Sequence, residues 1–354
     1  MGVTHVFNPE MEGEKMNARK SQKVRKTTMH WMVVATTLTV FCITLLIVSG
    51  AALAQQKKMI SIGTGGTGGV YYPYGGGIAS VITKYIPGVE ATAEVTAASG
   101  DNCILLGEGR VQLGLMGTDI AWDAYQGKLK GYNKEIPLRT VAELYPQVTS
   151  LIVLDGSGIN KMEDLKGKKV STGAPNSGTE FKVMRILKAY GLNPDIDIKR
   201  QRLSFTESAG ALKDRKLDAI FIDGGVPMAA VLDLAATPGM KIKFINHGEA
   251  VAKLNAEYGP IYFEHKIPKR TYPGIEYEST GVANANGLVT IDKMDEELVY
   301  KITKALFEHK ADLVRVHKEA DQISLDMAVT GSPIPFHKGA ARYYNEKKIK
   351  VKAE

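Results

Sequence analysis

Cysteine is scarce in this sequence. Only Cys42 and Cys103 occur among 354 residues, which excludes a small domain held together by several disulfides. Cys42 lies in an apolar segment that we expect to be removed, so the mature chain would keep Cys103 alone. A single cysteine forms no intrachain disulfide, and a buried thiol is its expected state.

Charge of one sign is not concentrated in a region that could bind nucleic acid. The chain has 45 basic and 38 acidic residues, and the first 54 residues hold six of the basic and three of the acidic ones. The remaining basic excess is small and scattered, without a cluster of Lys and Arg among aromatic residues. Because nucleic-acid binding depends on such a cluster, we expect no nucleic-acid partner.

Residue patterns of catalysis and metal binding are also missing. The histidines of the mature part show neither the spacing of metal ligands nor a nearby G-x-S-x-G motif. These histidines are His247, His265, His309, His317 and His337. We therefore predict no catalytic residue, no metal and no cofactor, and we do not expect an enzyme.

One long apolar run is present near the N-terminus. It extends from His30 to Leu53, follows a cluster of basic residues and is bounded by the small residues Ala52 and Ala54. This order is typical of a secretory signal peptide, so we predict cleavage after Ala54 and a periplasmic mature protein. Since about 20 apolar residues can span a bilayer, a retained N-terminal anchor is the alternative, which would suit a tethered sensor or structural module.

The rest of the chain alternates strand and helix patterns. Residues 59–125 follow the order β-α-β-α-β, and a similar rhythm restarts over residues 170–246. This predicts an α/β fold in which two mixed or parallel sheets are flanked by helices. The strongest helix pattern covers residues 292–316.

The length and the repeated rhythm predict two lobes with a ligand cleft between them. We expect the chain to cross from one lobe to the other near Ser150 and to return near Val282. The predicted parts are a signal peptide at residues 1–54, a discontinuous first lobe at residues 55–150 and 282–354, and a second lobe at residues 151–281.

Turns rich in Gly, Ser, Thr and Asn follow several of the predicted strands. They are segments 63–77, 97–102, 117–123, 173–180 and 223–228, and none contains Lys or Arg. Open α/β sheets bind ligands at the carboxyl ends of their strands, so a carboxylate here would be held by backbone N–H groups, hydroxyls and helix N-termini. Each turn could equally be a tight turn or a helix cap, and Ser177 with Glu180 has the pattern of a capping box.

The first of these turns has a second interpretation. Gly63–Gly68 satisfies G-x-G-x-x-G after a strand, and Glu90 lies at a tolerable distance for an acid that binds a ribose. The alternative function is therefore an exported NAD-dependent oxidoreductase on an α/β scaffold. The export signal argues against it, and so does the segment Tyr71–Gly75, which we expect to delay the start of the helix.

An aromatic and acidic segment lies in turn 117–123. Asp119 and Asp123 flank Trp122 and could receive an ammonium group or form the wall of a pocket. They could equally be the acidic start of a helix. Tyr71, Tyr72 and Trp122 would supply apolar walls with polar tips.

Several spaced motifs together resemble the TAXI-type solute-binding proteins of TRAP (tripartite ATP-independent periplasmic) transporters. The motifs are GTGGTGGVYYP at 63–73, SGDN at 99–102, GAPNSGTE at 173–180 and the strand-end glycines 224–225. The resemblance implies a two-lobed periplasmic-binding-protein fold of type II-like architecture, which closes on a ligand and delivers it to a TRAP-type membrane permease. Family ligands such as glutamate, glutamine and 2-oxoglutarate imply a small carboxylate or an amino acid.

The resemblance also implies a set of ligand-facing residues. They are Thr67, Tyr71, Ser99, Asn102, Pro175, Ser177 and Thr179. To these we add four residues of the turns described above, Asp119, Trp122, Gly178 and Gly224.

Overall fold

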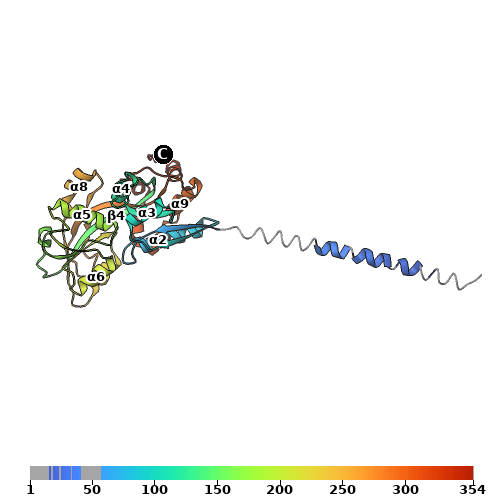
Figure 1. Cartoon of the computed structure of the whole chain (residues 1–354), viewed down its shortest axis with the longest axis horizontal. Helices are drawn as coiled ribbons and strands as arrows, with labels where there is room; N and C mark the ends of the chain where they lie inside the picture. Colours follow the sequence, from blue (N-terminus) through green and yellow to red (C-terminus); the bar gives the residue numbers. More distant parts are fainter. Residues whose placement is uncertain (1–15, 17–18, 24, 33, 41–56, 354) are drawn as a thin grey trace, which may run out of the picture. The chain divides into compact units, whose positions relative to one another are not determined.

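The computed structural model describes residues 16, 19–23, 25–32, 34–40 and 57–353. The chain divides into two units, Met1–Lys57 and Lys58–Glu354, and the described residues 19–40 of the first unit are helical (Figure 1). Over the described part of the chain, no helix has both the length and the apolar character needed to cross a membrane. The predicted cleavage site after Ala54 lies outside the described residues, as does Cys42.

The second unit begins with the expected alternation of strands and helices. Its first elements are β1 (Lys58–Gly63), α2 (Tyr71–Tyr85), β2 (Val89–Glu94), α3 (Ser99–Gly107), β3 (Leu113–Gly117) and α4 (Thr118–Tyr125). β1 pairs in parallel with both β2 and β3. The predicted β-α-β-α-β order is therefore confirmed for this part of the chain.

The start of α2 differs from the prediction. We expected residues 71–75 to delay the helix, but α2 begins at Tyr71 and contains Pro73 in its first turn. The first N–H groups of a helix have no partner within it, so a proline at this place removes no helical hydrogen bond.

A second run of alternating elements follows. It comprises η1 (Met162–Leu165), β5 (Lys169–Ser171), α5 (Gly178–Ala189), β6 (Lys199–Gln201), α6 (Phe205–Lys213), β7 (Ala219–Gly224), α7 (Ala229–Ala236), β8 (Ile242–Ile245), η2 (Gly248–Ala250), α8 (Val251–Tyr258) and β9 (Phe263–Ile267). At α5, Ser177 Oγ accepts a hydrogen bond from Glu180 N at 3.1 Å, as the capping box requires. The Glu180 carboxylate, however, accepts from Asn176 N at 2.9 Å and is held by Arg200 and Arg202.

Two long strands join these two runs. β4 (Leu138–Leu154) and β10 (Ser279–Ile291) pair antiparallel, from Leu138 opposite Ile291 to Val148 opposite Ala283. Beyond this shared stretch β4 pairs with β7 and β8, and β10 pairs with β9. The mixed α/β class is confirmed. In the described residues, the two predicted groups of strands form one continuous sheet of ten strands, eight of them in the order β2-β1-β3-β10-β4-β7-β5-β6, with β8 paired to β4 and β9 to β10.

We call the side with β1–β3 and α2–α4 the first half, and the side with β5–β9 and α5–α8 the second half. Figure 1 shows α5, α6 and α8 gathered on one side of β4, and α2, α3 and α4 on the other. β4 and β10 contain the predicted crossing points Ser150 and Val282 and belong to both halves. The division into two separate lobes at these residues stays a prediction.

The C-terminal elements are α9 (Glu296–Glu308), α10 (Lys310–Val316), η3 (Lys318–Gln322), α11 (Leu325–Val329) and α12 (Lys338–Glu346). The helix predicted over residues 292–316 is thus divided at His309, whose ψ of 27° leaves the helical range and whose ring stacks on Tyr85 at 3.3 Å between centroids. Near the end of the chain, Ala353 pairs with Phe336, which pairs with Thr140 at the start of β4.

Three hydrophobic clusters form the core. The largest includes Ile60 of β1, Leu144 of β4 and Ile220 of β7, so it extends into both halves. Residues 151–282 contribute a second cluster with Phe221, and a third lies around Leu106 of the first half. The shared cluster holds the two halves to the central strands.

Candidate functional site

Turns from the two halves meet directly. A Cβ atom on Gly178, the first residue of α5, would lie 2.6 Å from Ser99 Oγ of α3. A Cβ atom on Gly100 would collide with the carbonyl oxygen of Asn176. The absence of side chains at these two glycines lets the backbones of segments 97–102 and 173–180 touch.

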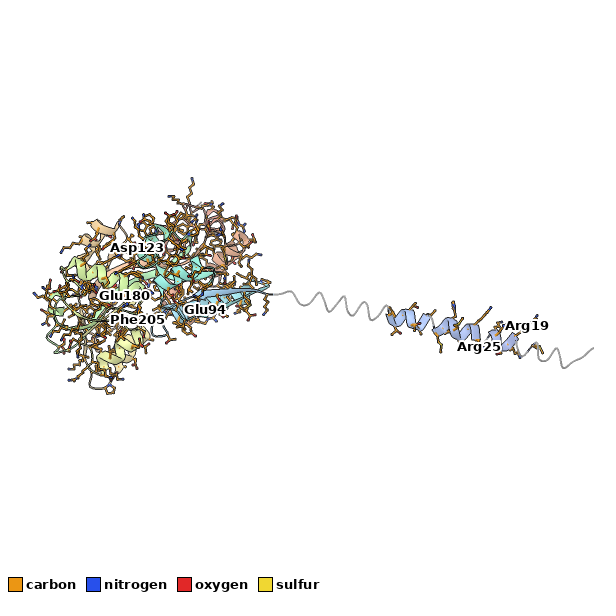
Figure 2. The ribbon with its side chains drawn as sticks, in the orientation of Figure 1. Arg19, Arg25, Glu94, Asp123, Glu180 and Phe205 are labelled. Carbon is orange, nitrogen blue, oxygen red and sulfur yellow. The ribbon has the colours of Figure 1, made fainter. Side chains whose placement is uncertain are left out.

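The glycine-rich turn of the first half also contacts the second half. Gly68 O accepts a hydrogen bond from Ala230 N at 3.2 Å, and a Cβ atom on Gly68 would lie 2.5 Å from Thr206 Oγ1. Gly69 packs on the ring of Phe205. Figure 2 marks Phe205 of α6, Glu180 of α5 and Asp123 of α4 where the helices of the two halves approach each other.

The predicted ligand-facing residues take different positions around these contacts. Thr67 and Pro175 are exposed, whereas Ser177, Gly178, Thr179 and Gly224 are buried. Ser99 is buried and its Oγ accepts from Gly117 N at 3.2 Å. The structure therefore brings Ser99 against Gly178, which lies between Ser177 and Thr179 in the sequence.

Asn102 lies beneath the first-half turns. Its Nδ2 donates to Thr64 O at 2.8 Å and to Leu115 O at 2.7 Å, and its Oδ1 accepts from Thr96 Oγ1 at 2.7 Å. These bonds connect the carboxyl ends of β1, β2 and β3. The amide of Asn102 is thus occupied within the protein and positions the turns.

A buried ion pair lies on the second-half side. Lys182 of α5 is 0% exposed, and its Nζ donates to both carboxylate oxygens of Asp223 at 2.9 Å. Thr149 Oγ1 donates to the same carboxylate at 2.9 Å. Burial raises the pKa of Asp223, and the charge of Lys182 opposes that rise. An ammonium and a carboxylate removed from water stay charged only through such pairing.

Asn284 of β10 connects this ion pair to the first half. Its Oδ1 accepts from Lys182 Nζ and from Gln147 Nε2, the latter at 3.1 Å. Its Nδ2 donates to Asp119 Oδ1 at 2.9 Å and to Thr118 Oγ1 at 3.3 Å. The side-chain amide of Asn284 therefore uses both of its donor hydrogens and both acceptor positions of its oxygen, and it does so on a strand that both halves share.

Tyr71 joins the same network from α2. Its hydroxyl donates to Gln147 Oε1 at 2.8 Å, and burial raises its pKa. Tyr71 therefore stays protonated and acts as a hydrogen-bond donor at neutral pH.

The network reaches the edge of the interface through α4. Tyr262 OH donates to Asp119 Oδ2 at 3.1 Å and accepts from Arg185 Nη1 at 2.7 Å. Arg185 also forms an ion pair with Asp123. Burial raises the pKa of Asp123 to about 6, and the charge of Arg185 opposes the rise.

Trp122 faces a different part of the surface. It lines a hollow of about 600 Å³ together with Tyr125, Ile136 and Arg139, and its ring stacks on Tyr125 at 6.1 Å between centroids. None of the residues of the buried network lines this hollow. Tyr71 is not among the residues that line this hollow, so a shared pocket wall of Trp122 and Tyr71 stays a prediction.

Sequence reasoning missed most of the buried network. Lys182 follows Gly178 by four residues on α5 and so lies on the face of the helix that meets the first half. Asn284 and Asn286 alternate with small residues in β10, and the period of two places both on one face of the sheet. These two spacings are the signals that could have identified the residues. The other missed members are Gln147, Arg185, Asp223 and Tyr262.

Comparison with known proteins gives one family match and several distant structural similarities. The model of the NMT1-like family matches residues 62–347. The periplasmic aliphatic sulphonate binding protein SsuA from Escherichia coli is 17% identical, with a TM-score of 0.45, over 82% of this chain and 83% of that chain. A putative L-cystine ABC transporter protein from Listeria monocytogenes is 18% identical, with a TM-score of 0.45, over 74% of this chain and 95% of that chain.

Proposed function

The chain belongs to the NMT1-like family, whose model matches residues 62–347, and we propose that it is an extracytoplasmic solute-binding receptor. It captures a small carboxylate or amino acid between its two halves and delivers the ligand to a TRAP-type membrane permease. Cleavage after Ala54 releases it into the periplasm. The observation that supports this proposal is the meeting of turns from both halves over a buried polar network.

The contact between the turns suits a carboxylate. The first turns of α3 and α5 meet there, and backbone N–H groups at helix N-termini attract anions. Hydroxyl groups of Ser99, Ser177 and Thr179 lie in the same segments. A ligand inserted between these turns would replace the direct contact between the two halves.

Lys182 supplies a positive charge below this contact. It lies one turn after Gly178 on α5, and one of its three hydrogen bonds goes to the neutral Asn284. A ligand carboxylate would be a stronger acceptor for that N–H than the amide oxygen. We therefore add Lys182 to the predicted ligand-binding side chains, which already include Tyr71.

The alternative oxidoreductase needs the Gly63–Gly68 turn for the pyrophosphate of a dinucleotide. In this structure Gly68 packs on Thr206 and accepts a hydrogen bond from Ala230. No observation in the structure favours that function over solute binding.

A thermal-shift and calorimetric screen tests the proposal. Residues 55–354 are unfolded and refolded to remove bound ligand, then screened against glutamate, glutamine, 2-oxoglutarate, other dicarboxylates and NAD. A ligand at roughly 1,000 times its Kd stabilises by about 4 kcal/mol, which raises Tm by on the order of 10 °C. A shift with one small acid supports the receptor. A shift with NAD alone, or no shift with any compound, contradicts it.

A further inference from the structure

Two carboxylates of the first half are buried against the second half. Asp119 and Asp123 lie four residues apart on α4. Asp119 is 1% exposed, and the Asp123 side chain is 16% exposed. Closure of the two halves removes both carboxylates from water, which is costly unless a cation compensates them.

One cation of the second half serves both carboxylates. Arg185 of α5 forms an ion pair with Asp123 and donates to Tyr262 OH at 2.7 Å. Tyr262 OH in turn donates to Asp119 Oδ2 at 3.1 Å. The Arg185 guanidinium also lies 4.2 Å from the centre of the Tyr258 ring, which holds it in place by a cation–π contact.

The remaining charged neighbours do not replace Arg185. Lys182 reaches Asp119 only through the Asn284 amide and is paired with Asp223. Lys128 lowers the pKa of Asp123 from a distance, and its side chain is exposed. Asp119 also accepts hydrogen bonds from Asn284 Nδ2 and Ile120 N, but neither donor carries a charge. Without Arg185, two carboxylates would face each other at the interface with weak compensation.

We propose that Arg185 is the positioning residue that permits the two halves to close. On closure, its guanidinium pairs with Asp123 and donates to Tyr262 OH, and Tyr262 OH in turn donates to Asp119. Asn284 connects Asp119 to Lys182, so these contacts belong to the same network as the proposed ligand site. This inference rests on the proposed function, because it assumes halves that open and close.

The test compares variants of residues 55–354 without ligand at pH 7.5. Hydrogen exchange is measured by mass spectrometry in segments 97–102 and 173–180, and the radius of gyration by small-angle X-ray scattering. For Arg185→Met we expect exchange in both segments to become at least roughly tenfold faster and the radius of gyration to increase. Hydrogen exchange in β4 should stay slow in this variant, because we expect the substitution to leave the fold intact.

A matched control removes another ion pair of the same helix. Lys188 pairs with Glu257 within the second half, so Lys188→Met should leave the exchange of both segments unchanged. The rescue variant Arg185→Met with Asp123→Asn removes one of the two carboxylate charges and should return the exchange toward the wild-type rate.

Asp123→Lys tests the contact from the other half and is safer for folding, because Asp123 is partly exposed. It should accelerate exchange in the same two segments. Wild-type exchange in Asp123→Lys overturns the inference, and so does a failure of the rescue. These exchange measurements use no ligand. A ligand screen without any thermal shift would therefore contradict the receptor function without changing the result of this test.

Discussion

At the scale of single residues, Asn102, which we predicted to face the ligand, also holds the first-half turns together through its side-chain amide. Asn102→Ala would remove the buried Nδ2 donor from Thr64 O and from Leu115 O, and Thr64 O would keep only Thr96 Oγ1 as a side-chain donor. We expect it to lower the free energy of unfolding by about 2–4 kcal/mol. Ser99→Ala loses one hydrogen bond, from Gly117 N, and should cost about 1 kcal/mol. Urea unfolding of residues 55–354 measures both, and equal losses would contradict this assignment.

The buried ion pair makes a second prediction. Lys182→Met leaves the Asp223 carboxylate buried without a cation, and we expect a loss of about 3–5 kcal/mol in the free energy of unfolding. Adding Asp223→Asn should recover most of the loss, because the remaining groups are neutral. Chemical denaturation of the two variants checks this, and a double variant no more stable than the single one would refute it.

Glu143 of β4 predicts a pH dependence of stability. Burial raises its pKa from 4.5 to about 8, and a hydrogen bond with Ser332 opposes the rise. The folded state therefore holds this proton more tightly than the unfolded chain does. The stability that this proton contributes is complete below about pH 4.5. Between about pH 4.5 and pH 8 it falls by roughly 1.4 kcal/mol per pH unit, and above about pH 8 it is lost.

The Glu143→Gln variant isolates this contribution. We expect wild-type protein to lose more stability than Glu143→Gln between pH 6 and pH 9 in urea unfolding. Glu319, whose pKa burial raises to about 7, changes stability in the same direction in both proteins and so cancels in the comparison. Identical pH profiles would show that Glu143 is not protonated in the folded state.

Individual site residues could be predicted only in part. The glycine and serine motifs led to Ser99 and Gly178, which do meet in the structure. Lys182 and Arg185 lie inside α5, where lysine and arginine are ordinary surface residues. Their burial depends on which helix faces which strand, and one sequence does not contain that information.

At the scale of elements, we expect the start of α5 to limit how closely the halves approach. Gly178→Ala adds a Cβ atom 2.6 Å from Ser99 Oγ, although alanine suits a helix better than glycine. We therefore expect the substitution to keep α5 folded, to speed hydrogen exchange in segment 97–102 and to reduce the ligand-induced rise in Tm.

Gly210→Ala is the matched control within α6. A Cβ atom there would meet nothing within 4 Å, so we expect a gain of about 0.5–1 kcal/mol in stability and unchanged exchange in segment 97–102. If both alanine variants behave alike, contact between the turns does not limit closure.

The observed boundaries of helices agree with the predicted ones where a local sequence pattern sets them. Ser177 capped α5 as predicted, because a serine side chain and the N–H three residues later suffice for a cap. α9 and α10 divide at His309, whose ring stacks on Tyr85 more than two hundred residues earlier, a contact that no local pattern indicates. The union of both strand groups in one sheet likewise depends on long-range pairing of β4 with β10.

At the scale of the whole molecule, closure should depend on pH when Arg185 is absent. The pKa of Asp123 is about 6 with Arg185 opposing its rise, so Arg185→Met raises that pKa further. At pH 5 the carboxyl is then protonated, its repulsion with Asp119 disappears, and we expect the variant to close. At pH 8 it should be open.

Small-angle X-ray scattering at the two pH values measures this change. Arg185→Met with Asp123→Asn cannot titrate at position 123 and should show the same radius of gyration at pH 5 and pH 8. A variant Arg185→Met that is equally open at both values would show that repulsion between the carboxylates does not drive opening.

Both ends of the described second unit lie outside the second half. β1 of the first half starts at Lys58, and Ala353 pairs with Phe336, which pairs with Thr140 at the start of the shared strand β4. The chain therefore enters and leaves the second half through the central strands. If the proposed closure occurs, a tag or surface attached at either end would hold the first half and the shared strands, and the second half would be the part that moves. A sensor made by immobilising this protein would then be expected to report ligand through the motion of the second half.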